Sequence, residues 1–203
     1  MRKRTRTGAV WLFIFVTNCT QTTWLWAASP IEQVRSTVQR VLEILKYPKF
    51  QGEVNKKQRR AELRQAIQPR FDFAEMAKRS LGNHWKRHAA RSNEFIPIFT
   101  DFVENSYVAN IESYKNEKIL YIRERLDNNF AQVDTKVVTS RGDEIPINYK
   151  LHTIGGEWKI YDVAIENVSL VNNYRSQFNR ILSTASFDEL LKKLQEKRQE
   201  SGS

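Results

Sequence analysis

Two histidines four residues apart are the first candidate for chemistry in this sequence. On a helix, His84 and His88 would place two imidazole rings on one side. A zinc site needs at least one further ligand, and usually a carboxylate that orients a histidine. The pattern supplies neither, and Gly82 is placed to end a helix before them. We therefore expect two surface histidines, no metal site and no cofactor.

Two aspartates that stand among aromatic residues could act as general bases. A buried carboxylate performs this chemistry when its surroundings shift its pKa toward the working pH. Asp72, however, is also explained as a helix N-cap, and Asp162 as a polar strand position or an ion-pair partner. The chain has no G-x-S-x-G, H-E-x-x-H or P-loop motif. We expect no catalytic residue and no enzyme, with a small enzyme acting on an apolar substrate as the alternative.

The N-terminal residues, 1–28, have the three-part layout of a secretory signal. Four basic residues precede a short apolar run, and small residues follow at Ala27 and Ala28. Cleavage there would remove Cys19, the only cysteine, and would leave 33 − 4 = 29 bases against 23 acids, or +6. A mature chain without disulfides favours a bacterial periplasm, and its positive charge favours anionic membrane surfaces. An uncleaved membrane anchor is the alternative.

The mature chain, residues 29–203, reads as one α+β domain. Apolar residues at helical spacing predict helices over 30–47, 55–67, 73–81 and 94–115, then two more helices before a tail that frays from about residue 196. Between residues 118 and 165 the period falls to two, which predicts about four antiparallel strands joined by short turns. The aromatic residues lie mostly among the apolar residues of the predicted helices and do not alternate with Lys or Arg, so we expect no nucleic-acid binding.

The strand at 157–165 raises the question of what the apolar residues enclose. Simple alternation places Trp158 and Ile160 on one face, and Tyr161, Val163 and Ile165 mainly on the other. Both faces should then be covered. The helix over 94–115 carries apolar residues on more than one side, so we expect it to be buried on two sides. An ordinary core and a slot for acyl chains both fit this pattern, because both are apolar.

Two segments carry a family resemblance. "FDFAEMAKRSLGNHW" (71–85) and "WKIYDVAIENVSLVNNYRSQFNRIL" (158–182) resemble signature segments of the MlaC family, also called the toluene-tolerance (Ttg2) family, over about residues 30–195. The resemblance implies a curved sheet related to nuclear-transport-factor-2-like (NTF2-like) domains, with N- and C-terminal helices around a hydrophobic pocket. Asn167 stands where the family usually has glycine, and Asn tolerates the same left-handed backbone.

The resemblance also implies a function. Members are periplasmic phospholipid-binding shuttle proteins that serve an inner-membrane ABC transporter complex and an outer-membrane lipoprotein complex, with transient membrane-surface contact. A carrier of another lipid, such as a hopanoid, is the close alternative. Arg175 is expected at the headgroup or docking surface, or in an ion pair with an acid such as Asp162. The residues expected to contact lipid are Phe73, Met76, Leu81, Trp85, Phe99, Phe102, Tyr107, Tyr149, Tyr161, Val163, Val168, Leu170, Tyr174 and Phe178.

Overall fold

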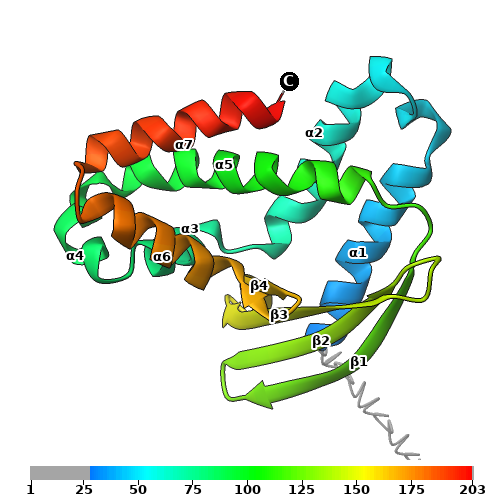
Figure 1. The fold of residues 1–203 in the computed structure, drawn as a ribbon. Coiled ribbons are helices and arrows are strands. Elements are labelled where there is room, and N and C mark those ends of the chain that lie inside the picture. Colours follow the sequence, from blue (N-terminus) through cyan, green and yellow to red (C-terminus); the bar gives the residue numbers. More distant parts are fainter. Residues whose placement is uncertain (1–27, 203) are drawn as a thin grey trace, which may run out of the picture.

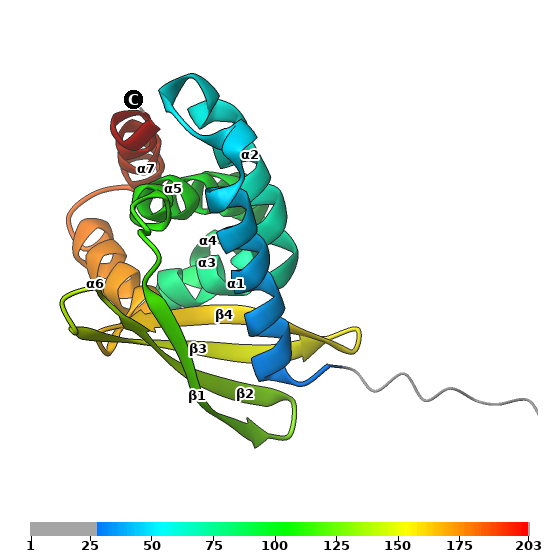
Figure 2. The same cartoon turned by 90° about the vertical axis from the view of Figure 1, so that its right-hand side faces the viewer.

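A curved antiparallel sheet forms one layer of the molecule, and the helices lie over a single face of it (Figures 1 and 2). The computed structural model describes the backbone of residues 28–202 and the side chains up to residue 197. The predicted α+β class is confirmed. The predicted signal lies outside the described residues, apart from its last position. Within 28–202, no helix is both long enough and apolar enough to cross a membrane.

The helices follow the predicted segments closely, and short 3-10 turns join several of them. Their bounds are α1 Pro30–Lys46, α2 Lys56–Ile67, α3 Phe73–Leu81, α4 Trp85–His88, α5 Ser92–Glu112, α6 Leu170–Leu182 and α7 Phe187–Gly202. The segment predicted to fray from about residue 196 falls in the last turns of α7.

Local hydrogen bonds explain where these helices begin and end. The Asp72 carboxylate accepts from the backbone N–H of Glu75 at 2.9 Å, which confirms it as the N-cap of α3. Gly82 ends α3 with a φ of 54°, a region that side chains rarely adopt. The Ser186 hydroxyl accepts from the N–H of Glu189 at 3.2 Å, as an N-cap side chain does, at the start of α7.

The sheet is a meander in the order β1-β2-β3-β4-β5. Its strands are β1 Lys118–Asp127, β2 Phe130–Val138, β3 Glu144–Ile154, β4 Glu157–Ile165 and the two-residue β5 Val168–Ser169. The four predicted strands are therefore confirmed, and β5 is added at the edge. The turn between β4 and β5 uses Asn167 with a φ of 66°, so the left-handed backbone expected there is present.

A β-bulge in β4 overturns the predicted division of that strand into two faces. Lys150 pairs with Asp162 but Leu151 pairs with Ile160, which leaves Tyr161 as an extra residue. The alternation therefore restarts after Tyr161, and Ile160, Val163 and Ile165 all line the same cavity. The outer face of the sheet at this point carries Tyr161, which meets Phe130 and His152 and lies beneath Arg79, together with polar side chains such as Lys150.

The main core is aromatic and lies between α5, α6 and α7. Phe95 and Phe99 of α5 are fully buried, and both meet Phe178 of α6 edge-on at 6.1 Å between ring centroids. One and two turns further along α5, Val103 and Tyr107 line a cavity that lies over the sheet. Burial of this helix on two sides is confirmed, because α7 packs on one side of it and α3 on another (Figure 1).

Candidate functional site

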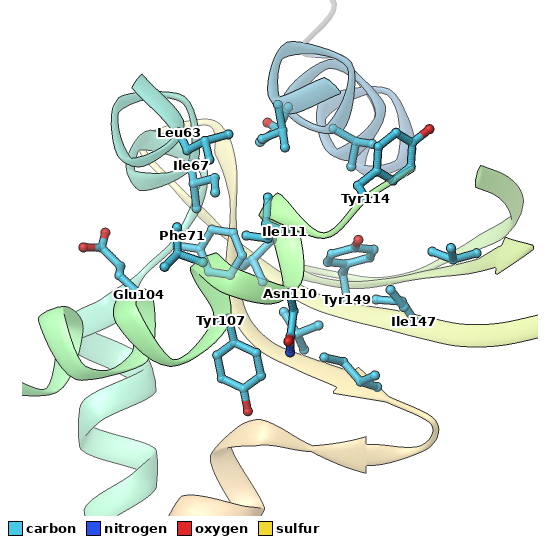
Figure 3. A pocket seen from close by; sticks show the side chains of 18 of the residues that line it. Leu63, Ile67, Phe71, Glu104, Tyr107, Asn110, Ile111, Tyr114, Ile147 and Tyr149 are labelled. Atoms are coloured by element: carbon cyan, nitrogen blue, oxygen red, sulfur yellow. The ribbon is translucent and has the colours of Figure 1, made fainter. Parts of the chain in front are cut away.

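A cavity of about 530 Å³ lies between the sheet and the helices α1, α2 and α5 (Figure 3). This volume is within the usual range of small-molecule sites, about 300–1,000 Å³. Most of the lining side chains are aliphatic. The sheet contributes a floor of β-branched residues, namely Ile119, Val137, Ile145, Ile147, Ile160, Val163 and Ile165.

Two sets of polar contacts, at opposite ends of the cavity, hold the helices in place above the sheet. At one end, the backbone N–H of Ile31 in α1 donates to the Glu124 carboxylate of β1 at 2.9 Å. At the other end, Arg59 and Arg60 of α2 both pair with Glu112 at the end of α5, at 2.8 and 3.0 Å. Between these ties the apolar faces of α1 and α2 stand over the sheet, and the space between them stays open.

Four of the polar side chains in the wall, namely Tyr149, Thr135, Glu104 and Arg64, are neutral or paired. Burial raises the pKa of Tyr149 to about 12, so its hydroxyl is uncharged at any physiological pH. The Thr135 hydroxyl donates to the carbonyl of Ile147 at 2.8 Å. Burial also raises the pKa of Glu104, whose carboxylate accepts from the Gln68 amide at 3.0 Å and lies 2.8 Å from Arg64 Nε. An apolar ligand therefore meets no unpaired charge among these groups.

Most of the residues predicted to contact lipid fall into two groups in the structure. One group lines the cavity: Phe73, Met76, Tyr107, Tyr149, Val163 and Leu170. The other group lies away from it. Trp85 packs against the main core, and five of these side chains are buried in it: Leu81, Phe99, Phe102, Tyr174 and Phe178.

The remaining predicted site residues are on the outside of the sheet and on α6. Tyr161 lies beneath the guanidinium of Arg79, 4.3 Å from it, and Val168 is 58% exposed in β5. Arg175 Nε donates to the carbonyl of Arg79 at 2.8 Å, and its chain packs against Gly82. Arg175 thus supports the C-terminal end of α3 and is not among the residues that line the cavity.

Several cavity residues were not selected from the sequence. Phe71 stacks on Phe73 at 5.5 Å between centroids, and in Figure 3 it faces the α2 residues Leu63 and Ile67. Ile147 was missed although it alternates with Tyr149 in β3, and that alternation was the signal available. The aliphatic stripe of α1 also lines the cavity: Val34, Val38, Val41, Leu42 and Leu45.

The side chains that could have supported catalysis or metal binding have structural partners. His84 Nε2 is 3.0 Å from the Asn179 amide oxygen, and His88 stacks on Phe187. The Asp72 carboxylate caps α3 and also contacts His152 at 2.9 Å. Within residues 28–202, no three or more His, Cys, Asp or Glu side chains form a group that could hold a metal ion.

Asp162 organises the start of α6. Its carboxylate accepts from the Ser169 hydroxyl at 2.7 Å and from the backbone N–H of Val171 at 3.2 Å. Its charged neighbour is Lys150, at 3.5 Å, and the ion pair considered with Arg175 is replaced by this one. Neither Asp72 nor Asp162 is among the residues that line the cavity.

Comparison with known proteins identifies relatives of this chain. The chain is 26% identical over 141 residues to the intermembrane phospholipid transport system binding protein MlaC of Haemophilus influenzae, which covers 66% of this chain and 65% of that relative. It is 26% identical over 155 residues to the toluene tolerance protein ttg2D of Pseudomonas putida, covering 75% and 72%. The chain thus spans just under two thirds of the length of the Haemophilus relative.

A solved structure has the same fold. The phospholipid-binding protein from Ralstonia solanacearum, determined in complex with a phospholipid, superposes with a TM-score of 0.74 at 22% identity, covering 87% of this chain and 100% of that one. The pattern that defines the MlaC protein family matches residues 35–196, most of the chain. This chain therefore belongs to the MlaC family.

Proposed function

We propose that this chain is a periplasmic carrier that shelters the acyl chains of a phospholipid in the cavity between its sheet and helices. The observation that supports this most directly is the chemistry of the wall. Aliphatic side chains from four strands and four helices surround a space of about 530 Å³, and the wall residues Tyr149 and Glu104 have raised pKa values. Such a wall favours hydrocarbon and disfavours a charged ligand group inside.

The physical task of a lipid carrier needs no covalent chemistry. Each methylene group that leaves water for an apolar site contributes about 0.8 kcal/mol, so a free diacyl lipid in water is strongly disfavoured. A cavity that replaces water around the chains removes most of this penalty. Members of the MlaC family are non-enzymatic lipid-binding transport proteins, and their action consists of binding and release.

The setting of the carrier follows from the family. Proteins of the MlaC family are periplasmic, and the N-terminal residues 1–28 of this chain read as the signal that would export it. The Haemophilus relative is named as the binding protein of an intermembrane phospholipid transport system. We propose that this chain serves an inner-membrane ABC transporter complex and an outer-membrane lipoprotein complex, with transient contact to membrane surfaces.

Native mass spectrometry of protein recovered from the periplasm of a Gram-negative host tests the proposal. The expected spectrum contains a 1:1 adduct with the mass of a diacyl phospholipid, and solvent extraction should recover that lipid with its headgroup. An adduct with the mass of a polycyclic lipid would instead indicate a carrier of a hopanoid-like lipid. Protein that is consistently empty, although folded by circular dichroism, would refute the proposal.

A further inference from the structure

The connection between α1 and α2 forms a tip that projects from the end of the molecule opposite α4 (Figure 1). We define the α1–α2 tip as residues 46–57. Two apolar side chains are exposed on it: Val54 is 97% exposed, the highest value among the exposed large apolar residues, and Tyr47 is 53% exposed. A single exposed apolar residue is ordinary on a protein surface, but these two stand together on one short protruding segment.

The tip has regular local structure. It contains two 3-10 turns, Pro48–Phe50 and Glu53–Asn55, separated by Gly52 at a φ of 81°. Arg59 Nη1 reaches back from α2 and donates to the carbonyls of Phe50 and Gly52 at 2.8 and 3.3 Å. Because Arg59 is itself paired with Glu112 of α5, the tip is tied to the body of the protein.

The charge of the tip is strongly positive. It has four lysines and one glutamate, hence a net charge of 4 − 1 = +3 over twelve residues. Lys46, Lys49 and Lys57 are exposed, and Lys56 lies 3.7 Å from Glu53. The neighbouring Arg59 and Arg60 hold Glu112 and are part of the framework. The tip therefore carries three exposed lysines and two exposed apolar side chains within twelve residues.

We propose that the α1–α2 tip docks this protein on the surface of an anionic phospholipid bilayer. Val54 enters the boundary between headgroups and acyl chains, Tyr47 lies at headgroup level, and the lysines contact lipid phosphates. A bilayer needs no matching shape, and positive charge complements its anionic headgroups.

The tip is continuous with the cavity wall. Leu45, just before the tip, and Arg60, three residues after it, both line the cavity, as does Leu42 one turn earlier in α1. Docking through the tip would therefore bring the α1–α2 end of the cavity next to the bilayer from which a lipid enters or into which it leaves. This step rests on the proposed function, whereas bilayer binding by the tip can be measured independently of it.

Vesicle co-sedimentation tests the charge requirement. Protein recovered from the periplasm is mixed with vesicles of phosphatidylcholine alone, or with vesicles in which part of it is replaced by phosphatidylglycerol. Binding should require the anionic lipid. The double variant Lys49→Gln/Lys57→Gln should bind roughly thirtyfold more weakly, corresponding to about 1 kcal/mol for each lysine. The matched control, Lys86→Gln/Arg87→Gln on the distant α4, should bind as the wild type does.

A second pair of variants tests the apolar contact. Val54→Ser should weaken binding roughly tenfold, because a buried aliphatic side chain is lost, and Ile154→Ser should not, although Ile154 is also an exposed apolar residue. In a Cys19→Ser background, an environment-sensitive fluorophore on Val54→Cys should shift its emission to the blue on anionic vesicles. The same label on Ile154→Cys should not shift.

Three results would overturn the inference: equal binding to neutral and anionic vesicles, an equal loss in the α4 control, or no emission shift at Val54. Native mass spectrometry of the same samples separates this failure from that of the proposed function. A lipid-loaded wild type that ignores vesicles would refute only the docking tip. A wild type that holds no lipid but binds vesicles through Val54 would refute only the carrier.

Discussion

Filling the cavity with a side chain should remove lipid binding without unfolding the protein. Val137 is the position of choice, because it pairs with Ile119 on one side and Ile145 on the other, and all three residues line the cavity. The Val137→Trp variant directs an indole into that space. Val138, the next residue in β2, is not among the lining residues, so Val138→Trp is a control with the same chemical change.

The expected loss of lipid affinity follows from the length of acyl chain that the indole would displace. If it excludes about four methylene groups, binding loses about 3 kcal/mol at ~0.8 kcal/mol each, which is more than a hundredfold in affinity. In a filled core the same enlargement would destabilise the fold by about 1–3 kcal/mol through overpacking. Over a cavity of about 530 Å³ there is room for the ring, so we expect the delipidated protein to lose less than about 1 kcal/mol.

The assay compares lipid occupancy by native mass spectrometry with urea unfolding of the delipidated proteins. Val137→Trp should be empty and nearly as stable as the wild type, and Val138→Trp should be loaded. The wild type should also unfold at higher urea when loaded, since a ligand bound only to the folded state stabilises it. The reasoning is refuted if Val137→Trp carries as much lipid as Val138→Trp, because the lipid would then occupy another place.

Three further predictions concern the framework. Gly82→Ala should lower the free energy of unfolding by about 2 kcal/mol, measured by urea titration. The backbone at this position has a φ of 54°, and the new Cβ would come within 3.1 Å of Arg175 Cδ. Burial raises the pKa of Glu104, so its ionised form opposes folding. The stability of the wild type relative to Glu104→Gln should therefore fall as the pH rises above the ordinary pKa of a glutamate, about 4; a flat difference would contradict this. Asp162→Ala leaves the N–H of Val171 without its acceptor and should cost about 2 kcal/mol of stability, while native mass spectrometry shows the folded fraction still loaded.

The secondary structure was predictable from the sequence because local signals agreed with the tertiary fold. Asp72 followed by Glu75, and Gly82 after the last apolar residue, fixed both ends of α3. The period-two pattern located the four long strands between residues 118 and 165. The faces of β4 were not predictable, since the bulge at Tyr161 is an insertion in the pairing with β3 and leaves no mark in β4 alone.

The division between core and cavity could not be read from the pattern either. Phe99 and Tyr107 lie two turns apart on α5, and both belong to its apolar surface. Phe99 meets Tyr174 and Phe178 in a closed aromatic cluster, whereas Tyr107 lines the cavity. The difference depends on how far α1 and α2 stand from the sheet, which is set by long-range contacts such as the one between Glu124 and Ile31.

A crystal structure of the protein purified from a Gram-negative host, with no lipid added, tests the central claim most directly. The account predicts continuous, elongated electron density between the strand residues Ile147 and Tyr149 and the helix residues Leu42 and Ile67, with the density ending in a headgroup near solvent. A cavity that is filled by water, or closed by the approach of α1 to the sheet, while lipid is bound elsewhere on the protein, would contradict it.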